Sequence, residues 1–409
     1  MKRALALCLT LFPLLAMAQM WDRLAISPYA HDTTQVRQLR IEADVLTFFR
    51  DNEYSSKLTR GYSLPGMWLQ PKLTYMPMRQ IRIEAGAHAL IFNGANRYPC
   101  YVYHDIGTWK GNQYQKGAHV LPWVRVQAQF KHLTVVLGDI YGGQNHRLVE
   151  PLWNPETNLS QDPETGFQLL WDRKHLHADT WMNWQSYIFE EDSHQEAFTV
   201  GSSWQVLYGD TASDLRFSTP VQLLFHHRGG EQDTTQMGVQ TLCNASLGVQ
   251  MEWRTRRKVL TAVTAEANAL ACYQQAGTLW PFDTGFAAQA SAGVSLWDKL
   301  HFKGGYFHAP GHFVSLYGSP FFSTLSIREG RESFKGIGTA YLRADYHHTF
   351  ARNYVLGAGI EAGQSWLGKS ATRSRSQEFN FSFGIYLRAC PSFLLKQFKK
   401  EAIGSMAHR

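Results

Sequence analysis

The feature of this sequence that most restricts its fold is an alternation of apolar and polar residues that recurs in segment after segment. In the segment 377–390, Phe379, Phe381 and Phe383 alternate with polar or small residues, and the segments 80–93, 214–227 and 237–255 alternate in the same way. Successive side chains of a β-strand point to opposite faces, so each segment is predicted to be a strand with one apolar face. The fold class is therefore predicted to be all-β.

We predict sixteen strands between residues 36 and 390. Their approximate ranges are 36–50, 62–76, 80–93, 118–131, 133–141, 166–173, 175–189, 196–208, 214–227, 237–255, 258–272, 285–298, 299–308, 337–350, 353–367 and 377–390. The connections after even-numbered strands are short, whereas three of those after odd-numbered strands are much longer, namely 93–117, 142–165 and 309–336. This asymmetry is typical of a transmembrane up-and-down antiparallel barrel with both termini in the periplasm.

The outer membrane gives a physical reason for such a pattern. An unpaired backbone group in hydrocarbon costs several kcal/mol, so a sheet in a membrane must close on itself. Its apolar face then meets lipid and its polar face lines the interior. A soluble β-sandwich would bury the apolar face against a second sheet, but it does not account for the long strands or for the alternation of loop lengths.

The last predicted strand carries a resemblance to a known class. The aromatic segment Phe379 to Leu387 resembles the C-terminal recognition strand of porin-type bacterial outer-membrane β-barrel proteins, and the architecture over 36–390 is similar to theirs. The resemblance implies a barrel in the outer membrane of a Gram-negative cell, in contact with membrane lipid and possible as a homo-oligomer. Proteins of that class usually end at the last strand, whereas this chain continues as a basic tail over 391–409, which is predicted to be periplasmic.

Residues 1–18 have the features of a secretory signal peptide. Two cations precede a short apolar stretch, and Ala16-Met17-Ala18 matches a cleavage site. Gln19 is then predicted to begin the mature chain, with a short periplasmic segment over 19–35. The alternative is a buried N-terminal helix. Removal of the signal lowers the formal charge from +7 by two, which does not favour nucleic acid as a partner.

The alternation also predicts which charged side chains line the interior. The predicted basic residues are Arg40, Lys72, Arg82, Arg125, Arg216, Arg254, Lys303, Arg343 and Arg388. The predicted acidic residues are Glu42, Asp44, Glu84, Asp179, Glu252, Glu266, Asp345 and Glu361. The two signs nearly balance, so a channel lined by them would be weakly selective. Alternatively, each residue belongs to a cross-strand charge pair that stabilises the wall.

A sixteen-stranded barrel encloses an aqueous channel unless a segment folds inwards. The candidate is the segment Glu150 to Glu156 of the loop 142–165, which includes Trp153, Asn154 and two prolines that restrict its conformation. The alternative is a loop packed on the outside of the barrel. Trp181 is predicted to point inwards and offers a stacking surface for a sugar or another ring, unless it only fills the wall.

Residues suited to catalysis are sparse in this pattern. His301 follows Asp298 and His347 follows Asp345, but neither pair has a recognisable third partner, so the protein is predicted not to be an enzyme. The adjacent histidines at 226–227 and 347–348 point to opposite faces, so no metal site and no cofactor are predicted.

The cysteines beyond the signal peptide are predicted to lie on different faces or at different ends of the barrel. No disulfide is therefore predicted among Cys100, Cys243, Cys272 and Cys390, and a bulge near the end of the strand 258–272 is the one arrangement that would bring Cys243 and Cys272 together.

Taken together, these patterns predict a porin-like channel for passive, weakly selective diffusion of small solutes. A first alternative is a barrel with an occluded interior that acts as a structural or assembly partner of other envelope proteins, which the long loops and the basic tail suggest. A second alternative is an outer-membrane enzyme.

Overall fold

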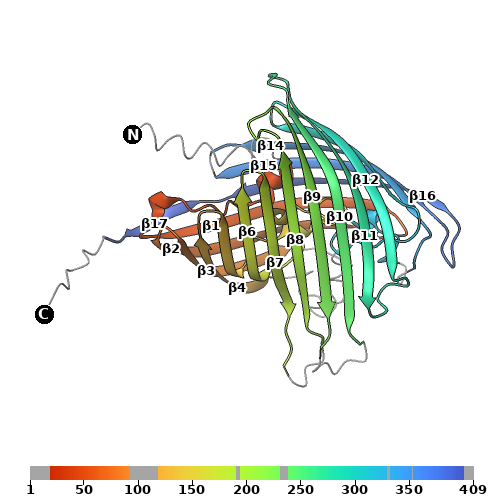
Figure 1. Cartoon of the computed structure of the whole chain (residues 1–409), viewed down its shortest axis with the longest axis horizontal. Coiled ribbons are helices and arrows are strands. Elements are labelled where there is room, and N and C mark those ends of the chain that lie inside the picture. Colours follow the sequence, from red (N-terminus) through yellow and green to blue (C-terminus); the bar gives the residue numbers. More distant parts are fainter. Residues whose placement is uncertain are drawn as a thin grey trace.

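The computed structural model describes residues 19–92, 118–189, 194–230, 238–328, 332–351 and 353–399. Within these ranges, no helix is both long and apolar enough to cross a membrane. A single antiparallel sheet makes up the wall (Figure 1). Its strands are β1 (Gln38–Ser55), β2 (Arg60–Met78), β3 (Ile81–Phe92), β4 (Ala118–Gln129), β5 (Leu133–Asp139), β6 (Thr165–Arg173), β7 (Leu176–Ser186), β8 (Ala197–Tyr208), β9 (Leu215–Arg228), β10 (Gln240–Arg254), β11 (Leu260–Ala276), β12 (Thr284–Leu296), β13 (Leu300–Ala309), β14 (Ile337–Thr349), β15 (Tyr354–Leu367), β16 (Ser376–Ala389) and β17 (Ser392–Gln397).

The sheet closes into a barrel. Each strand from β1 to β15 pairs with the next, and β16 pairs in turn with β1, as in Val45 opposite Ala389. After Pro391 the chain resumes as β17, which pairs with the first residues of β1, so β16 and β17 together form one side of the seam. The wall therefore continues to Gln397, beyond residue 390. The predicted sixteen-stranded antiparallel barrel is confirmed.

The wall is apolar outside and polar inside. On β12 the outward side chain of Phe286 is 67% exposed, whereas the inward side chains of Ser291 on the same strand and of Asn268 on β11 are buried. In water such a distribution would leave a large apolar surface uncovered. It suits a sheet whose outer face is covered by hydrocarbon.

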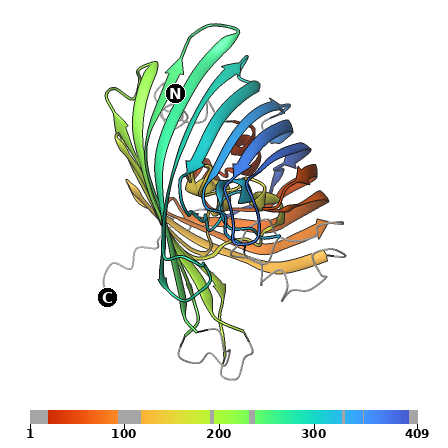
Figure 2. The ribbon, with the colours of Figure 1, turned by 90° about the vertical axis from the view of Figure 1, so that its right-hand side faces the viewer.

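In the described part of the chain, three segments occupy the interior of the barrel (Figure 2). The first, the N-terminal segment 19–37, carries the helix α2 (Met20–Ala25) and the 3₁₀ helix η2 (Thr33–Gln35). The second, the β5–β6 loop over 140–164, carries η4 (Gly143–His146) and α4 (Thr157–Ser160). The third, the β13–β14 loop over 310–336, carries η5 (Pro320–Phe322).

Buried apolar side chains fix these segments to the wall and to one another. Met20 and Leu24 of α2 are fully buried in a cluster that includes Leu46 and Tyr386 of the wall. The β13–β14 loop contributes several buried phenylalanines to a larger cluster, in which its Tyr317 meets Trp153 of the β5–β6 loop at a ring distance of 5.9 Å. The interior is thus a packed core, which an open channel would lack.

Candidate functional site

The β5–β6 loop enters the barrel early because β5 is short. The turn begins at Gly142 and Gly143, and Gly143 has φ of +62°, a backbone conformation that favours glycine. The 3₁₀ helix η4 begins at Gly143 and ends at His146, and the following residue, Arg147, is also left-handed with φ of 52°. This tight turn directs His146, the last residue of η4, towards the inner face of β7.

His146 lies between two carboxylates. Its Nδ1 is 2.7 Å from Oδ2 of Asp179 on β7, and its Nε2 is 3.1 Å from Oε2 of Glu164 at the end of the loop. The imidazole also stacks on Trp181, with ring centroids 3.5 Å apart and an interplanar angle of 9°. Sequence analysis did not select His146 or Glu164, whereas it did place Asp179 and Trp181 on the inner face.

The surroundings hold His146 in its charged form. Burial alone would lower the pKa of its imidazole, but the carboxylates of Glu164 and Asp179 outweigh burial and raise that pKa to about 9. Burial would likewise raise the pKa of Glu164, and the His146 imidazolium lowers it instead. Oε1 of Glu164 also accepts a hydrogen bond from the backbone N–H of Gly143 at 2.7 Å.

Glu150, another carboxylate of the β5–β6 loop, fixes this loop to the opposite wall. Tyr341 donates a hydrogen bond to its Oε2 at 2.8 Å, and Nζ of Lys303 lies 2.9 Å from the same oxygen. Arg343 forms an ion pair with the other oxygen. Burial would raise the pKa of Glu150, but Arg343 and Lys303 hold it far below its usual range.

Glu156, also in the β5–β6 loop, fixes the loop to β1 and β2. Nε of Arg50 lies 2.5 Å from its Oε2, and Asn52 donates to that oxygen at 3.0 Å. Tyr62 donates to the other oxygen. Between Glu150 and Glu156, the backbone N–H of Asn154 donates to the carbonyl of Tyr317 at 2.8 Å. The predicted constriction segment, Glu150 to Glu156, thus lies inside the barrel with its carboxylates bound to the wall.

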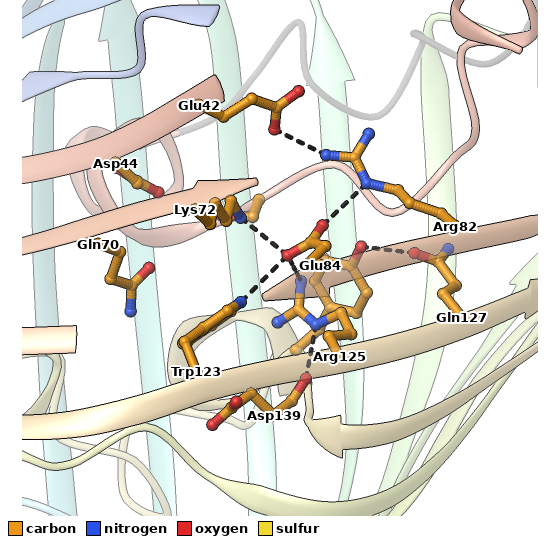
Figure 3. A network of polar contacts seen from close by, with 12 residues as sticks. Glu42, Asp44, Gln70, Lys72, Arg82, Glu84, Trp123, Arg125, Gln127 and Asp139 are labelled. Atoms are coloured by element: carbon orange, nitrogen blue, oxygen red, sulfur yellow. Dashed lines mark hydrogen bonds and ion pairs between the residues drawn. The ribbon is translucent and has the colours of Figure 1, made fainter. Parts of the chain in front are cut away.

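The charged residues of β1 to β4 form a network of their own (Figure 3). Glu84 lies at its centre, 3.0 Å from Nζ of Lys72 and 2.8 Å from Nε of Arg82, with Arg125 at 3.7 Å. Trp123 donates its indole N–H to Glu84 at 3.2 Å, and Arg82 also pairs with Glu42 at 2.7 Å.

Most of the other predicted interior charges pair in the same way. The contacts are Arg40 with Glu42 at 4.0 Å, Arg388 with Asp44 at 2.6 Å, Arg216 with Glu252 at 2.5 Å, Arg254 with Glu252 at 3.3 Å, Lys303 with Glu266 at 3.1 Å and Arg343 with Glu361 at 2.6 Å. Asp345 is buried beside them on β14. Charges engaged in this way stabilise the wall and the segments within it.

The histidines considered from sequence have other partners than expected. Nδ1 of His301 lies 2.8 Å from Oγ of Ser295, and its Nε2 lies 3.3 Å from Nδ1 of His347. Neither contact involves the aspartates that neighbour these histidines in sequence. Cys243, Cys272 and Cys390 are free thiols, and Cys100 lies outside the described residues.

Beside His146 the interior retains a cavity of about 350 Å³. Its lining includes Asn145, His146, Asp179, Arg216 and Glu266. The cavity is therefore bounded by the β5–β6 loop on one side and by the polar inner faces of β7 to β12 on the other. Of the histidine–carboxylate groups inside the described part of the barrel, that of His146 combines two acidic partners with an adjacent cavity, which makes it the candidate site.

Solved structures of known proteins have the same fold. The chain is similar to OprD from Pseudomonas aeruginosa, with 9% identity, a TM-score of 0.51, and coverage of 90% of this chain and 100% of that chain. It is also similar to a double variant of OccD1 (OprD), with 11% identity, a TM-score of 0.50, and coverage of 90% and 100%. At such low identity the likeness concerns the fold alone. No curated protein matches the chain in sequence. The protein is an integral outer-membrane β-barrel, as predicted.

A family model overturns the predicted function. The model described as lipid A 3'-O-deacylase-type matches residues 31–398, nearly the whole chain. A deacylase is a hydrolase, so two predictions are wrong: that the barrel is a passive transport channel for small solutes, and that it is not an enzyme. Paired charges and a channel lining give the same alternation in sequence, which is why the pattern alone did not separate them. The chain belongs to the lipid A 3'-O-deacylase-type family.

Proposed function

We propose that the protein is an outer-membrane hydrolase that removes an ester-linked acyl chain from lipid A, with His146 as its acid–base residue. The family match over residues 31–398 is the observation that carries the proposed activity. The placement of His146 between Asp179 and Glu164, beside an interior cavity, supports it as the reacting group. The packed interior is also in keeping with an enzyme rather than with a pore.

The geometry suggests how the site works. Hydrolysis requires a neutral imidazole that takes a proton from water while the water oxygen attacks the ester carbonyl. The ester C–O bond then breaks, the sugar oxygen takes a proton from the imidazolium, and a free fatty acid and a hydroxyl group remain. Asp179, bound to Nδ1, is placed to keep Nε2 as the nitrogen that exchanges the proton.

Glu164 occupies the position that the attacking water molecule and the ester oxygen would take in the reaction. Its carboxylate binds both Nε2 of His146 and the N–H of Gly143. When Glu164 moves away, Nε2 becomes free for a water molecule and the Gly143 N–H becomes free to stabilise an oxyanion. Loss of one of the two neighbouring carboxylates also lowers the pKa of His146, so the imidazole becomes neutral when it becomes accessible.

The test is release of fatty acid from lipid A. Purified protein in lipid A vesicles is expected to release acyl chains, detected by mass spectrometry of the lipid product. His146→Gln is expected to lower the rate by roughly 10² to 10⁴-fold, the usual contribution of a general acid–base group. The matched control is His312→Gln in the β13–β14 loop, where the histidine contacts Ser333 and lies outside the site.

Both variants must fold for the comparison to hold, which heat-dependent migration in gels reports for membrane barrels. If the wild-type protein releases no acyl chain from lipid A, the proposed activity is wrong. If folded His146→Gln is as active as His312→Gln, the activity stands and the assignment of His146 is wrong.

A further inference from the structure

The first described residue lies next to a carboxylate, that of Asp22, for which the described residues provide no ion-pair partner within 4 Å. The backbone nitrogen of Gln19 is 3.1 Å from Oδ2 of Asp22, and the other oxygen of Asp22 accepts a hydrogen bond from Nε2 of Gln144 at 3.3 Å. Within the described ranges, no lysine, arginine or histidine nitrogen forms an ion pair with Asp22. Burial raises the pKa of Asp22, and the more distant charges of Arg147 and Lys303 and its hydrogen bonds offset that rise only in part.

Cleavage of the signal peptide would place a positive charge on the nitrogen of Gln19, within hydrogen-bonding distance of Asp22. Hydrolysis of the peptide bond between Ala18 and Gln19 by a signal-peptidase-class protease adds one water, leaving a carboxylate on Ala18 and a primary amine on Gln19. The amine is protonated at neutral pH. We propose that the α-ammonium group of Gln19 is the ion-pair partner of Asp22 in the mature protein, so that removal of the signal completes this partly buried contact.

The surrounding structure keeps the two groups in place. Met20 and Leu24, on the apolar side of α2, are fully buried against the wall, so the helix that carries Asp22 is fixed there. Further along, the carbonyl of Ile26 and the hydroxyl of Ser27 accept hydrogen bonds from Arg388 at 2.9 Å. The nitrogen of Gln19 is thus already positioned for the ion pair with Asp22.

Hydrogen bonds connect the Gln19–Asp22 ion pair to the candidate site. Asp22 binds Gln144, and the backbone N–H of Ser27 donates to Oδ1 of Asn145 at 2.8 Å. Gln144 and Asn145 belong to η4, which ends at His146. The Gln19–Asp22 pair is therefore a positioning contact for η4. Its effect on hydrolysis rests on the proposed function, whereas the ion pair itself does not.

Chemical labelling of the terminal amine tests the ion pair without reference to activity. Mass spectrometry of the mature protein is expected to find Gln19 at its start with a free amine. An amine-selective reagent near pH 7 is expected to modify that amine about tenfold more slowly in the wild-type protein than in Asp22→Asn, because one unit of pKa is a tenfold change in free amine. Equal labelling rates in the two proteins would refute the pair. A different first residue, or Gln19 cyclised with loss of ammonia, would also refute it.

A shifted terminus provides the second test. One alanine inserted between Ala18 and Gln19 moves the ammonium by one residue, about 3.8 Å along the chain. The insertion and Asp22→Asn are each expected to lower the temperature of unfolding, and the double variant is expected to be no less stable than either alone. Gln19→Ser, which keeps the amine and cannot cyclise, is the matched control and should behave like the wild type. Additive losses in the double variant would contradict the proposal.

Discussion

Glu150 and Lys303 lie 2.9 Å apart, Oε2 to Nζ, although one belongs to the β5–β6 loop and the other to β13 on the wall. Both side chains are largely buried, and Arg343 and Tyr341 of β14 bind the same carboxylate. The contact joins a loop to the far wall of its own barrel. It is one reason why the interior is a fixed structure and not a passage.

Removing that carboxylate should therefore be costly. Glu150→Gln leaves Lys303 with Glu266 alone and Arg343 with Glu361, both still buried. We expect the free energy of unfolding, measured by urea titration in lipid vesicles, to fall by about 3 kcal/mol, the low end for breaking a buried pair. The control is Asp214→Asn, which breaks an exposed pair with Arg256 and should cost less than about 1 kcal/mol. Equal losses in the two variants would contradict this assignment.

The stability of the barrel should also depend on the charge of His146. Its pKa of about 9 in the folded protein exceeds the value of about 6.5 expected for an unfolded chain, so the folded state binds this proton more tightly. The resulting stabilisation is complete below about pH 6.5 and is lost as the pH rises through about 9. Urea titrations at a series of pH values measure it.

His146→Gln is the control for that pH dependence. Glutamine cannot titrate, so the decline in stability between pH 6.5 and 9 should become smaller in this variant, and only the part that the α-ammonium of Gln19 contributes should remain. The lowered pKa of Glu164 acts only in acid, below the window concerned. A wild-type protein whose stability is the same at both ends of the window would show that His146 is not held in its charged form.

Much of the wall could be predicted from the sequence because strand formation depends on local alternation. The pattern that ends in Phe379, Phe381 and Phe383 is visible without any knowledge of what pairs with it. The position at which the wall ends was harder to predict from the sequence. Pro391 lacks an N–H and marks the end of a strand in sequence, yet its carbonyl accepts a hydrogen bond from Ala43 at 3.0 Å, and β17 resumes directly afterwards.

The candidate site could not be predicted because its contacts are not local. His146 meets Asp179 across 33 residues and Glu164 across 18, and both separations are too long for a local sequence pattern to join the residues. The turn at Gly142 and Gly143 brings them together, and the pair of glycines was the only sequence signal for it. Alternation placed Asp179 and Trp181 on the inner face but gave no indication of what they would contact.

The stack of His146 on Trp181 depends on the absence of a side chain at Gly201. Gly201 lies opposite Trp181 on β8, and a methyl group there would come within 2.1 Å of Cζ2 of the indole. We expect Gly201→Ala to lower the free energy of unfolding by about 1–3 kcal/mol and to lower the rate of hydrolysis, because the displaced indole no longer supports the imidazole. Gly311→Ala, where no atom lies within 4 Å of the new methyl group, should change stability by no more than about 0.5 kcal/mol. A tolerated Gly201→Ala would mean that Trp181 has room to move.

The two carboxylates beside His146 should have separable effects on the reaction. Glu164→Gln removes a negative charge next to Nε2, so the pKa of the imidazole falls and its neutral form appears at lower pH. We expect the acidic limb of the rate profile to move to lower pH by about one unit or more, with the rate at its plateau retained. Asp179→Asn also removes a charge, but its amide N–H can donate to Nδ1 and favour the wrong imidazole tautomer, so the plateau rate should fall by roughly 10²-fold or more. Profiles of fatty-acid release from lipid A vesicles between pH 5 and 10 measure both effects. A plateau that falls equally in the two variants would show that Glu164 takes part in the reaction itself and does not merely cover Nε2.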